Sequence, residues 1–116
     1  MIKGIGIDII EVKRVRRLAR DKKFLKKIYT DEEIGYCRSR KKSWEHYAVR
    51  FAAKEAVWKA LGDKALPLKD ISVINNPDGK PEVYIGGRRV SGSVFISLTH
   101  TSDYAAAFCI AMQKSG

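Results

Sequence analysis

The chain has 116 residues, of which 45% are hydrophobic and 31% charged, the length and composition of one globular domain over residues 1–116. This excludes a multidomain enzyme, a long repeat array and a chain too polar to bury a core. The sequence contains neither the roughly 18-residue apolar run that spans a bilayer nor a secretory signal, so we expect a cytoplasmic protein without membrane association. Cys37 and Cys109 have no CxxC partner and are predicted to be buried thiols.

The charge is strongly basic and unevenly distributed. Twenty-three Lys and Arg against thirteen Asp and Glu give a formal net charge of +10. Nine of these cations crowd one stretch near the N-terminus: Lys13, Arg14, Arg16, Arg17, Arg20, Lys22, Lys23, Lys26 and Lys27. The excess predicts an acidic partner, and charge alone leaves open nucleic acid, an anionic membrane, a phosphorylated small molecule or an acidic protein.

The first half of the chain predicts one strand and three helices. Residues 2–7 favour a strand that ends at Asp8, with glycines that permit close approach of another backbone. Apolar residues at helical spacing from Glu11 predict a basic amphipathic helix. A capping box at residues 30–33 predicts a short second helix toward Arg40. The third, long helix covers residues 44–61 and ends at Gly62.

The second half predicts strands joined by turns. Short apolar runs at residues 71–74, 83–85, 94–99 and 104–112 are separated by turn residues at 76–79 and 86–87. The order of elements therefore predicts an α+β domain with one long central helix and a mainly antiparallel sheet.

Two acidic residues lie within or next to segments that are otherwise apolar. Glu55 falls within the apolar stripe of the long helix, where a buried carboxylate is costly without a partner, and Asp8 closes the apolar opening strand. Together they fit a site for a hard cation such as Mg²⁺, which takes one or two carboxylates and leaves other positions to water and phosphate. Taken singly, Asp8 also fits a turn residue and Glu55 an ion pair with Lys59.

Cationic and polar groups surround this pair in the sequence. Arg50, Lys54 and Lys59 flank Glu55 on the helix, an arrangement suited to phosphate. His100 closes an apolar strand at a polar turn, where an ordinary turn histidine is the alternative.

Four motifs together resemble one family. They occur in its order and spacing and span nearly the whole chain: residues 4–11 (GIGIDIIE), 50–56 with 59–62 (RFAAKEA and KALG), 78–81 (DGKP) and 97–100 (SLTH). The chain resembles the holo-[acyl-carrier-protein] synthases, the short single-domain phosphopantetheinyl transferases. The resemblance implies the 4′-phosphopantetheinyl transferase fold.

The resemblance also implies a reaction. In this family, 4′-phosphopantetheine passes from coenzyme A to a serine of apo-acyl carrier protein with Mg²⁺, releasing adenosine 3′,5′-bisphosphate and activating the carrier for fatty acid biosynthesis. By position in the motifs, Asp8 and Glu55 would hold the metal, Glu55 would act as general base directly or through a water, and Lys59 would stabilise developing charge.

The remaining roles follow from the same resemblance. Arg50 and His100 match contacts to the 3′-phosphate of coenzyme A, and Gly79, Lys80 and Pro81 match contacts to its nucleotide. Arg14 and Arg17 on the basic helix match the docking surface for the acidic carrier protein. The family further implies a homotrimer with sites between subunits.

Two other classes of function remain as alternatives. A small basic nucleic-acid-binding module would explain the net charge but not Asp8 or Glu55, and no aromatic-rich basic strand typical of RNA recognition is present. A non-catalytic adaptor that binds an acidic protein would likewise leave the two carboxylates unexplained. We therefore expect an enzyme without a nucleic-acid partner.

Overall fold

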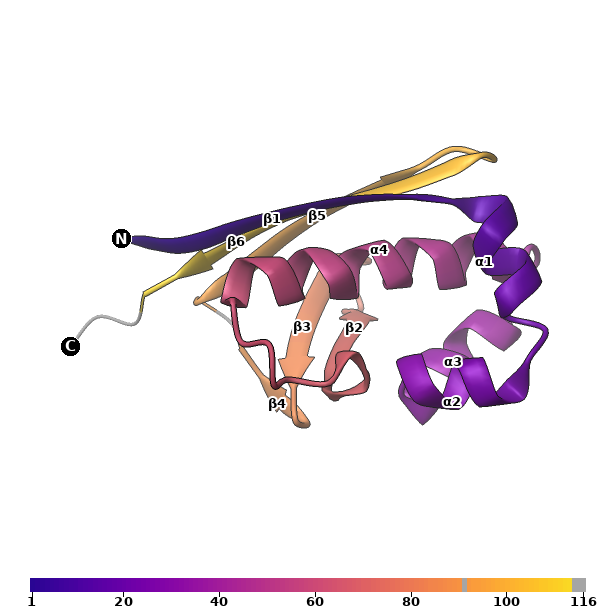
Figure 1. Ribbon diagram of the computed structural model, residues 1–116, viewed down its shortest axis with the longest axis horizontal. Coiled ribbons are helices and arrows are strands. Elements are labelled where there is room, and N and C mark those ends of the chain that lie inside the picture. The colour runs from indigo at the N-terminus through magenta and orange to yellow at the C-terminus, as the bar shows by residue number, and fades with distance from the viewer. Residues whose placement is uncertain (91, 114–116) are drawn as a thin grey trace.

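The N-terminal and C-terminal strands build one sheet. The computed structural model describes residues 1–90 and 92–113. In it, β1 (Ile2–Glu11) pairs antiparallel with β6 (Tyr104–Met112), which pairs antiparallel with β5 (Val94–His100), giving the order β1-β6-β5. Figure 1 shows this sheet as the long upper layer of the molecule.

A second antiparallel sheet has the order β2-β3-β4, whereas the sequence pattern predicts a single sheet. A 3₁₀ turn, η1 (Leu68–Asp70), leads into β2 (Ile71–Asn75), which forms a hairpin with β3 (Pro81–Ile85), and β3 pairs with the two-residue β4 (Arg88–Arg89). The predicted turns are confirmed, since Gly79, Gly86 and Gly87 all have positive φ.

The long helix α4 (Ser43–Leu61) lies between the two sheets (Figure 1). Its predicted end is confirmed, because Gly62 caps it in the left-handed conformation with φ 71°. Alanine fills half of its buried positions: Ala48, Ala52, Ala53, Ala56 and Ala60. A helix covered on two sides by sheets has no single solvent face, so most of its circumference must be small or apolar.

Two glycines set the distance between β1 and α4. A Cβ atom at Gly4 would overlap the carbonyl oxygen of Ala60, and one at Gly6 would overlap that of Ala56. The close backbone approach predicted for these glycines is therefore confirmed. It brings Asp8, two residues along the same face, next to the middle of α4.

Three short helices occupy the end of the molecule beside the start of α4. They are α1 (Val12–Leu18), α2 (Lys22–Ile28) and α3 (Asp31–Arg38), and α3 begins with the predicted capping box between Thr30 and Glu33. The count of three helices in the first half misses α2, whose N-cap is Asp21, accepting from the Lys23 N–H. Its apolar residues lie within the run of lysines, which hides the helical period.

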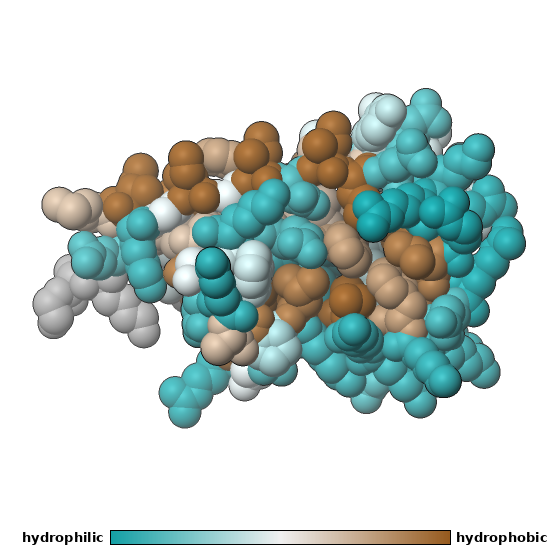
Figure 2. All heavy atoms as spheres, in the orientation of Figure 1, coloured by the Kyte–Doolittle hydropathy of each residue, from teal (hydrophilic) through white to brown (hydrophobic). Residues whose placement is uncertain are grey.

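The prediction that β1 ends at Asp8 is wrong. The strand continues to Glu11, and Asp8 is paired with Ala107 inside the ladder. Alternate residues from Gly4 to Ile10 face α4, whereas Ile5, Ile7 and Ile9 face outward and are 62–68% exposed. Figure 2 shows these side chains as a brown row along the upper edge.

No helix in the described part of the chain is long and apolar enough to cross a membrane.

Candidate active site

Asp8, Lys59 and Glu55 come together where β1 crosses α4. Lys59 Nζ donates to the main-chain carbonyl oxygen of Ile7 at 3.0 Å and lies 3.3 Å from Asp8 Oδ1. The Asp8 side chain is 19% exposed and that of Lys59 47% exposed, so the ion pair sits at the rim of the sheet–helix junction. Glu55 precedes Lys59 by one helical turn and is half-buried.

Glu55 is the less compensated of the two carboxylates. Burial raises the pKa of Glu55, the negative charge of Asp8 raises that pKa further, and the Lys59 ammonium opposes both effects. Like charges held together at a partly buried site favour a cation that both can share. In the described ranges, His, Cys, Asp and Glu form no cluster of three or more, so the chain offers two carboxylates at this point. That donor set fits Mg²⁺ with phosphate and water as its other ligands.

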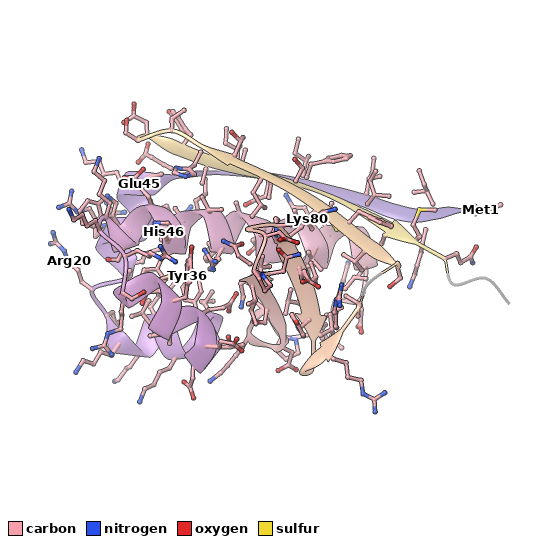
Figure 3. All side chains as sticks on the ribbon, turned by 180° about the vertical axis from the view of Figure 1, so that it is seen from behind. Met1, Arg20, Tyr36, Glu45, His46 and Lys80 are labelled. Carbon is pink, nitrogen blue, oxygen red and sulfur yellow. The ribbon has the colours of Figure 1, made fainter. Side chains whose placement is uncertain are left out.

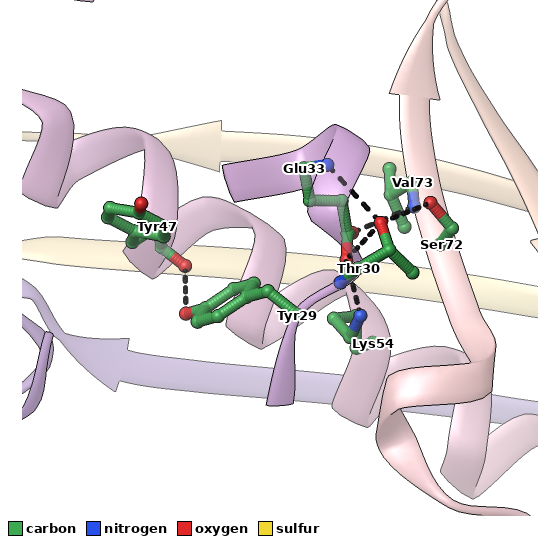
Figure 4. Close-up of polar contacts among 7 residues, drawn as sticks. All are labelled: Tyr29, Thr30, Glu33, Tyr47, Lys54, Ser72 and Val73. Atoms are coloured by element: carbon green, nitrogen blue, oxygen red, sulfur yellow. Dashed lines mark hydrogen bonds and ion pairs between the residues drawn. The ribbon is translucent and has the colours of Figure 1, made fainter. Parts of the chain in front are cut away.

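Lys54 does not belong to this group, although it precedes Glu55. Its ammonium is fully buried and lies 2.6 Å from Glu33 Oε1 on the side of α4 facing α3 and β2. Figure 4 shows Glu33 also accepting from the main-chain N–H groups of Thr30 and Val73, at 3.0 Å each. The expectation that Lys54 flanks the metal ligand is therefore wrong, because neighbours in a helix point about 100° apart.

Arg50 and His100 lie near the start of α4, away from the carboxylate pair. Arg50 is 4% exposed, and its Nε atom is buried without a hydrogen-bond partner. His100, at the end of β5, places Nδ1 3.5 Å from Glu45 Oε1. Both residues lower the pKa of His46, so they lie in one neighbourhood.

Three residues of this neighbourhood were not singled out from the sequence: Tyr36, Arg40 and His46. The Arg40 and Arg50 guanidinium carbons lie 4.5 and 4.2 Å from the centroid of the Tyr36 ring, and the His46 ring meets the same ring edge-on. The available signal was the spacing of four residues from His46 to Arg50, which places this pair on one face of α4, whereas Arg40 lies beyond the end of α3.

Gly79 and Lys80 lie in the β2–β3 turn, and Pro81 begins β3. The Asn76 side chain shapes the turn by accepting from the main-chain N–H groups of Asp78 and Lys80. Lys80 itself is exposed.

Arg14 and Arg17 lie exposed on α1, while Val12 and Val15 on the same helix are buried. The predicted amphipathic helix is thus confirmed. Figure 2 shows hydrophilic residues covering this end of the molecule, where α1, α2 and α3 gather.

Comparison with known proteins identifies the family. Residues 4–109 match the family model of the 4′-phosphopantetheinyl transferase superfamily. A holo-[acyl-carrier-protein] synthase from Thermodesulfovibrio yellowstonii is 46% identical over 113 residues, which cover 95% of this chain and 98% of that protein. One from Desulforudis audaxviator is 40% identical, covering 99% and 96% of the two chains.

Solved structures of holo-[acyl-carrier-protein] synthases have a fold similar to that of this chain. A Bacillus anthracis holo-(acyl-carrier-protein) synthase in complex with CoA (3′,5′-ADP) has a TM-score of 0.86 and 35% identity, covering 98% of this chain and 99% of that one. The Helicobacter pylori enzyme in complex with coenzyme A has a TM-score of 0.77 and 27% identity, covering 92% and 98%. With its matching fold and its paired acidic side chains at the β1–α4 crossing, this chain belongs to the holo-[acyl-carrier-protein] synthases of the 4′-phosphopantetheinyl transferase superfamily.

Proposed function

We propose that this protein transfers 4′-phosphopantetheine from coenzyme A to a serine hydroxyl of apo-acyl carrier protein, and so activates the carrier for fatty acid biosynthesis. The serine oxygen forms a bond to the phosphorus that carries the pantetheine arm, the bridging bond of the pyrophosphate breaks, and adenosine 3′,5′-bisphosphate leaves. The observation that carries the proposal is the junction of Asp8, Glu55 and Lys59.

Asp8 and Glu55 are the residues that would hold Mg²⁺, whose chemistry is to neutralise charge on the pyrophosphate oxygens. Lys59 is fixed by the Ile7 carbonyl and presents its ammonium at the same rim, where it stabilises charge on the leaving phosphate. Glu55 borders the same rim of the β1–α4 crossing, and in this proposal its carboxylate takes the serine proton, directly or through a water.

The contacts to coenzyme A are assigned to two groups of residues on different parts of the chain. Arg50 and His100 would bind the 3′-phosphate, and the turn of Gly79, Lys80 and Pro81 would contact the nucleotide. One group lies at the start of α4 and the other on the second sheet. The two groups nevertheless lie close together in one chain. Arg50 lies over the Tyr36 ring, and Asn75, which pairs with Pro81, donates from Nδ2 to the Tyr36 hydroxyl at 3.4 Å.

A homotrimer is also part of the proposal, and the outer face of the first sheet supports it. On this face, Ile110 of β6 is paired with Ile5 of β1 on one side and with Phe95 of β5 on the other. Ile7 of β1 is paired with Phe108 of β6. An exposed apolar face of this kind is typical of an interface between subunits. Docking of the acidic carrier protein on Arg14 and Arg17 completes the proposal, supported by their exposure on the basic end of the molecule.

The test is direct. The protein is incubated with coenzyme A, Mg²⁺ and an apo-acyl carrier protein, and the carrier is weighed by mass spectrometry. We expect the mass of one phosphopantetheine arm on the carrier and no addition when EDTA is present. An unmodified carrier under the complete conditions would contradict the proposal, and strong, salt-dependent binding to DNA in its place would favour the nucleic-acid alternative.

A further inference from the structure

Tyr36 is the centre of a group of basic side chains. The guanidinium groups of Arg40 and Arg50 lie over its ring, with distances from Cζ to the ring centroid of 4.5 and 4.2 Å. The His46 ring meets the Tyr36 ring edge-on, with centroids 5.7 Å apart and an angle of 82°. Figure 3 shows Tyr36, His46 and Glu45 close together where α3 meets the start of α4.

The positive charge of this group is poorly compensated. Among residues 1–90 and 92–113, neither Arg40 nor Arg50 forms an ion pair with a carboxylate. Arg50 is also buried and leaves its Nε without an acceptor, which is costly for a guanidinium in a site shielded from water. The group therefore has both the charge and the unused hydrogen-bonding capacity to receive an anion.

His46 faces charged groups from three parts of the fold. Arg50 and Glu45 belong to α4, Arg40 follows α3, and His100 ends β5. Burial lowers the pKa of His46 from its ordinary value of 6.5, the charges of Arg50, Arg40 and His100 lower that pKa further, and only Glu45 opposes them. In the free protein the imidazole is therefore neutral at pH 7.

We propose that His46 is a further member of the anion site of Arg50 and His100, and that it takes up a proton when the terminal phosphate of coenzyme A binds there. The inference rests on the proposed function, because that function brings the phosphate to Arg50 and His100. A dianion placed among these cations favours the imidazolium form of His46. The complex then carries one more proton than the separate molecules. Coenzyme A therefore binds more tightly as pH falls from the pKa of His46 in the complex to the lower pKa of His46 in the free protein.

The chain makes this proton uptake measurable, because it contains only two histidines. The ring protons of His46 and His100 are followed by NMR titration, with His46→Gln and His100→Gln assigning the signals. We expect coenzyme A to raise the pKa of His46 by about one unit or more, and dephospho-coenzyme A, which lacks the 3′-phosphate, to leave it in place. Each unit of increase gives at most about a tenfold gain in affinity.

Calorimetry supplies the second measurement. The Kd for coenzyme A is compared at pH 8 and pH 6 in the wild type and in His46→Gln, with circular dichroism as the check on folding. Titration of the ligand's own phosphate is common to both proteins, so the wild type should gain several-fold more affinity on acidification than the variant. Arg40→Gln, at an exposed position, is the companion variant: it removes one opposing charge, so the pKa of His46 should rise in the free protein and in the complex, and the pH range over which affinity increases should move upward.

The outcomes separate the two proposals. Coenzyme A that binds with the same pH dependence in the wild type, His46→Gln and Arg40→Gln would refute the role of His46 and leave the transferase intact. Absence of any coenzyme A binding would overturn the proposed function itself. If His46→Gln does not fold, the wild-type NMR titration and Arg40→Gln decide the question.

Discussion

Two carboxylates at the β1–α4 crossing have unequal surroundings. Asp8 is paired with Lys59, whereas the charge of Glu55 is opposed by burial and by Asp8. Removing either charge with little change of shape should therefore act on chemistry more than on folding. We expect Asp8→Asn and Glu55→Gln to lower the rate of transfer about a hundredfold to ten-thousandfold, the range for loss of a positioned acid or base.

The measurement is the initial rate of carrier modification at saturating Mg²⁺, with melting temperature as the folding control. Glu32→Gln is the matched variant, since Glu32 is an exposed carboxylate on α3. It should keep wild-type activity. Full activity in Asp8→Asn or Glu55→Gln would show that the pair does not serve catalysis.

The sequence allowed Asp8 and Glu55 to be proposed as site residues. An acidic residue within an apolar pattern is recognisable whether the pattern has the spacing of a strand or of a helix. The sequence could not separate Lys54 from Lys59. Lys54 is one residue from Glu55 and Lys59 is four residues from it, so both lie near it in the sequence. Only the three-dimensional packing shows that Lys54 contacts Glu33 and that Lys59 contacts Asp8. His46 was missed for the same reason, since its neighbours come from distant parts of the chain.

Between elements, the buried pair of Glu33 and Lys54 ties three of them together. Glu33 caps the start of α3, pairs with α4 and accepts from the N–H of Val73 on β2. Burial lowers the pKa of Lys54, and the partner carboxylate opposes this effect. Lys54→Met leaves Glu33 buried without its cation and should cost about 3–5 kcal/mol of unfolding free energy.

The double variant Glu33→Gln with Lys54→Met removes both charges and should recover part of that loss. Urea unfolding of the single and double variants measures the coupling. Equal stability of wild type and Lys54→Met would mean that the pair does not hold these elements together.

The start of α3 and the end of α4 were predictable, because the capping box and Gly62 act locally. The number of sheets was not, because strands at residues 71–89 and 94–112 show the same alternation whichever sheet they join. Only α4, lying between them, divides the strands into two layers.

Across the whole molecule, the basic charge is concentrated at the end that carries α1 and α2. Reversing Arg14 and Arg17 to Glu should raise KM for the carrier protein about tenfold with a smaller change in kcat, because attraction to an acidic surface is lost before chemistry begins. The difference from wild type should shrink at high salt.

The control reverses Lys69 and Arg88, two exposed cations outside α1 and α2, which changes net charge by the same amount. It should leave KM near the wild-type value. An equal rise of KM in both double variants would indicate a general effect of net charge and contradict docking on α1.

The apolar row of Ile5, Ile7 and Ile9 has a consequence for dilution. In the proposed trimer each cleft needs a neighbouring copy, so mass action governs how many complete clefts exist. Specific activity should drop when the enzyme is diluted below the concentration at which subunits separate, and Ile7→Lys should produce the same drop in concentrated solution. Light scattering gives the oligomeric state in the dilution series and in Ile7→Lys, and specific activity is measured on the same samples. Unchanged specific activity in a monomeric Ile7→Lys variant would show that one chain suffices.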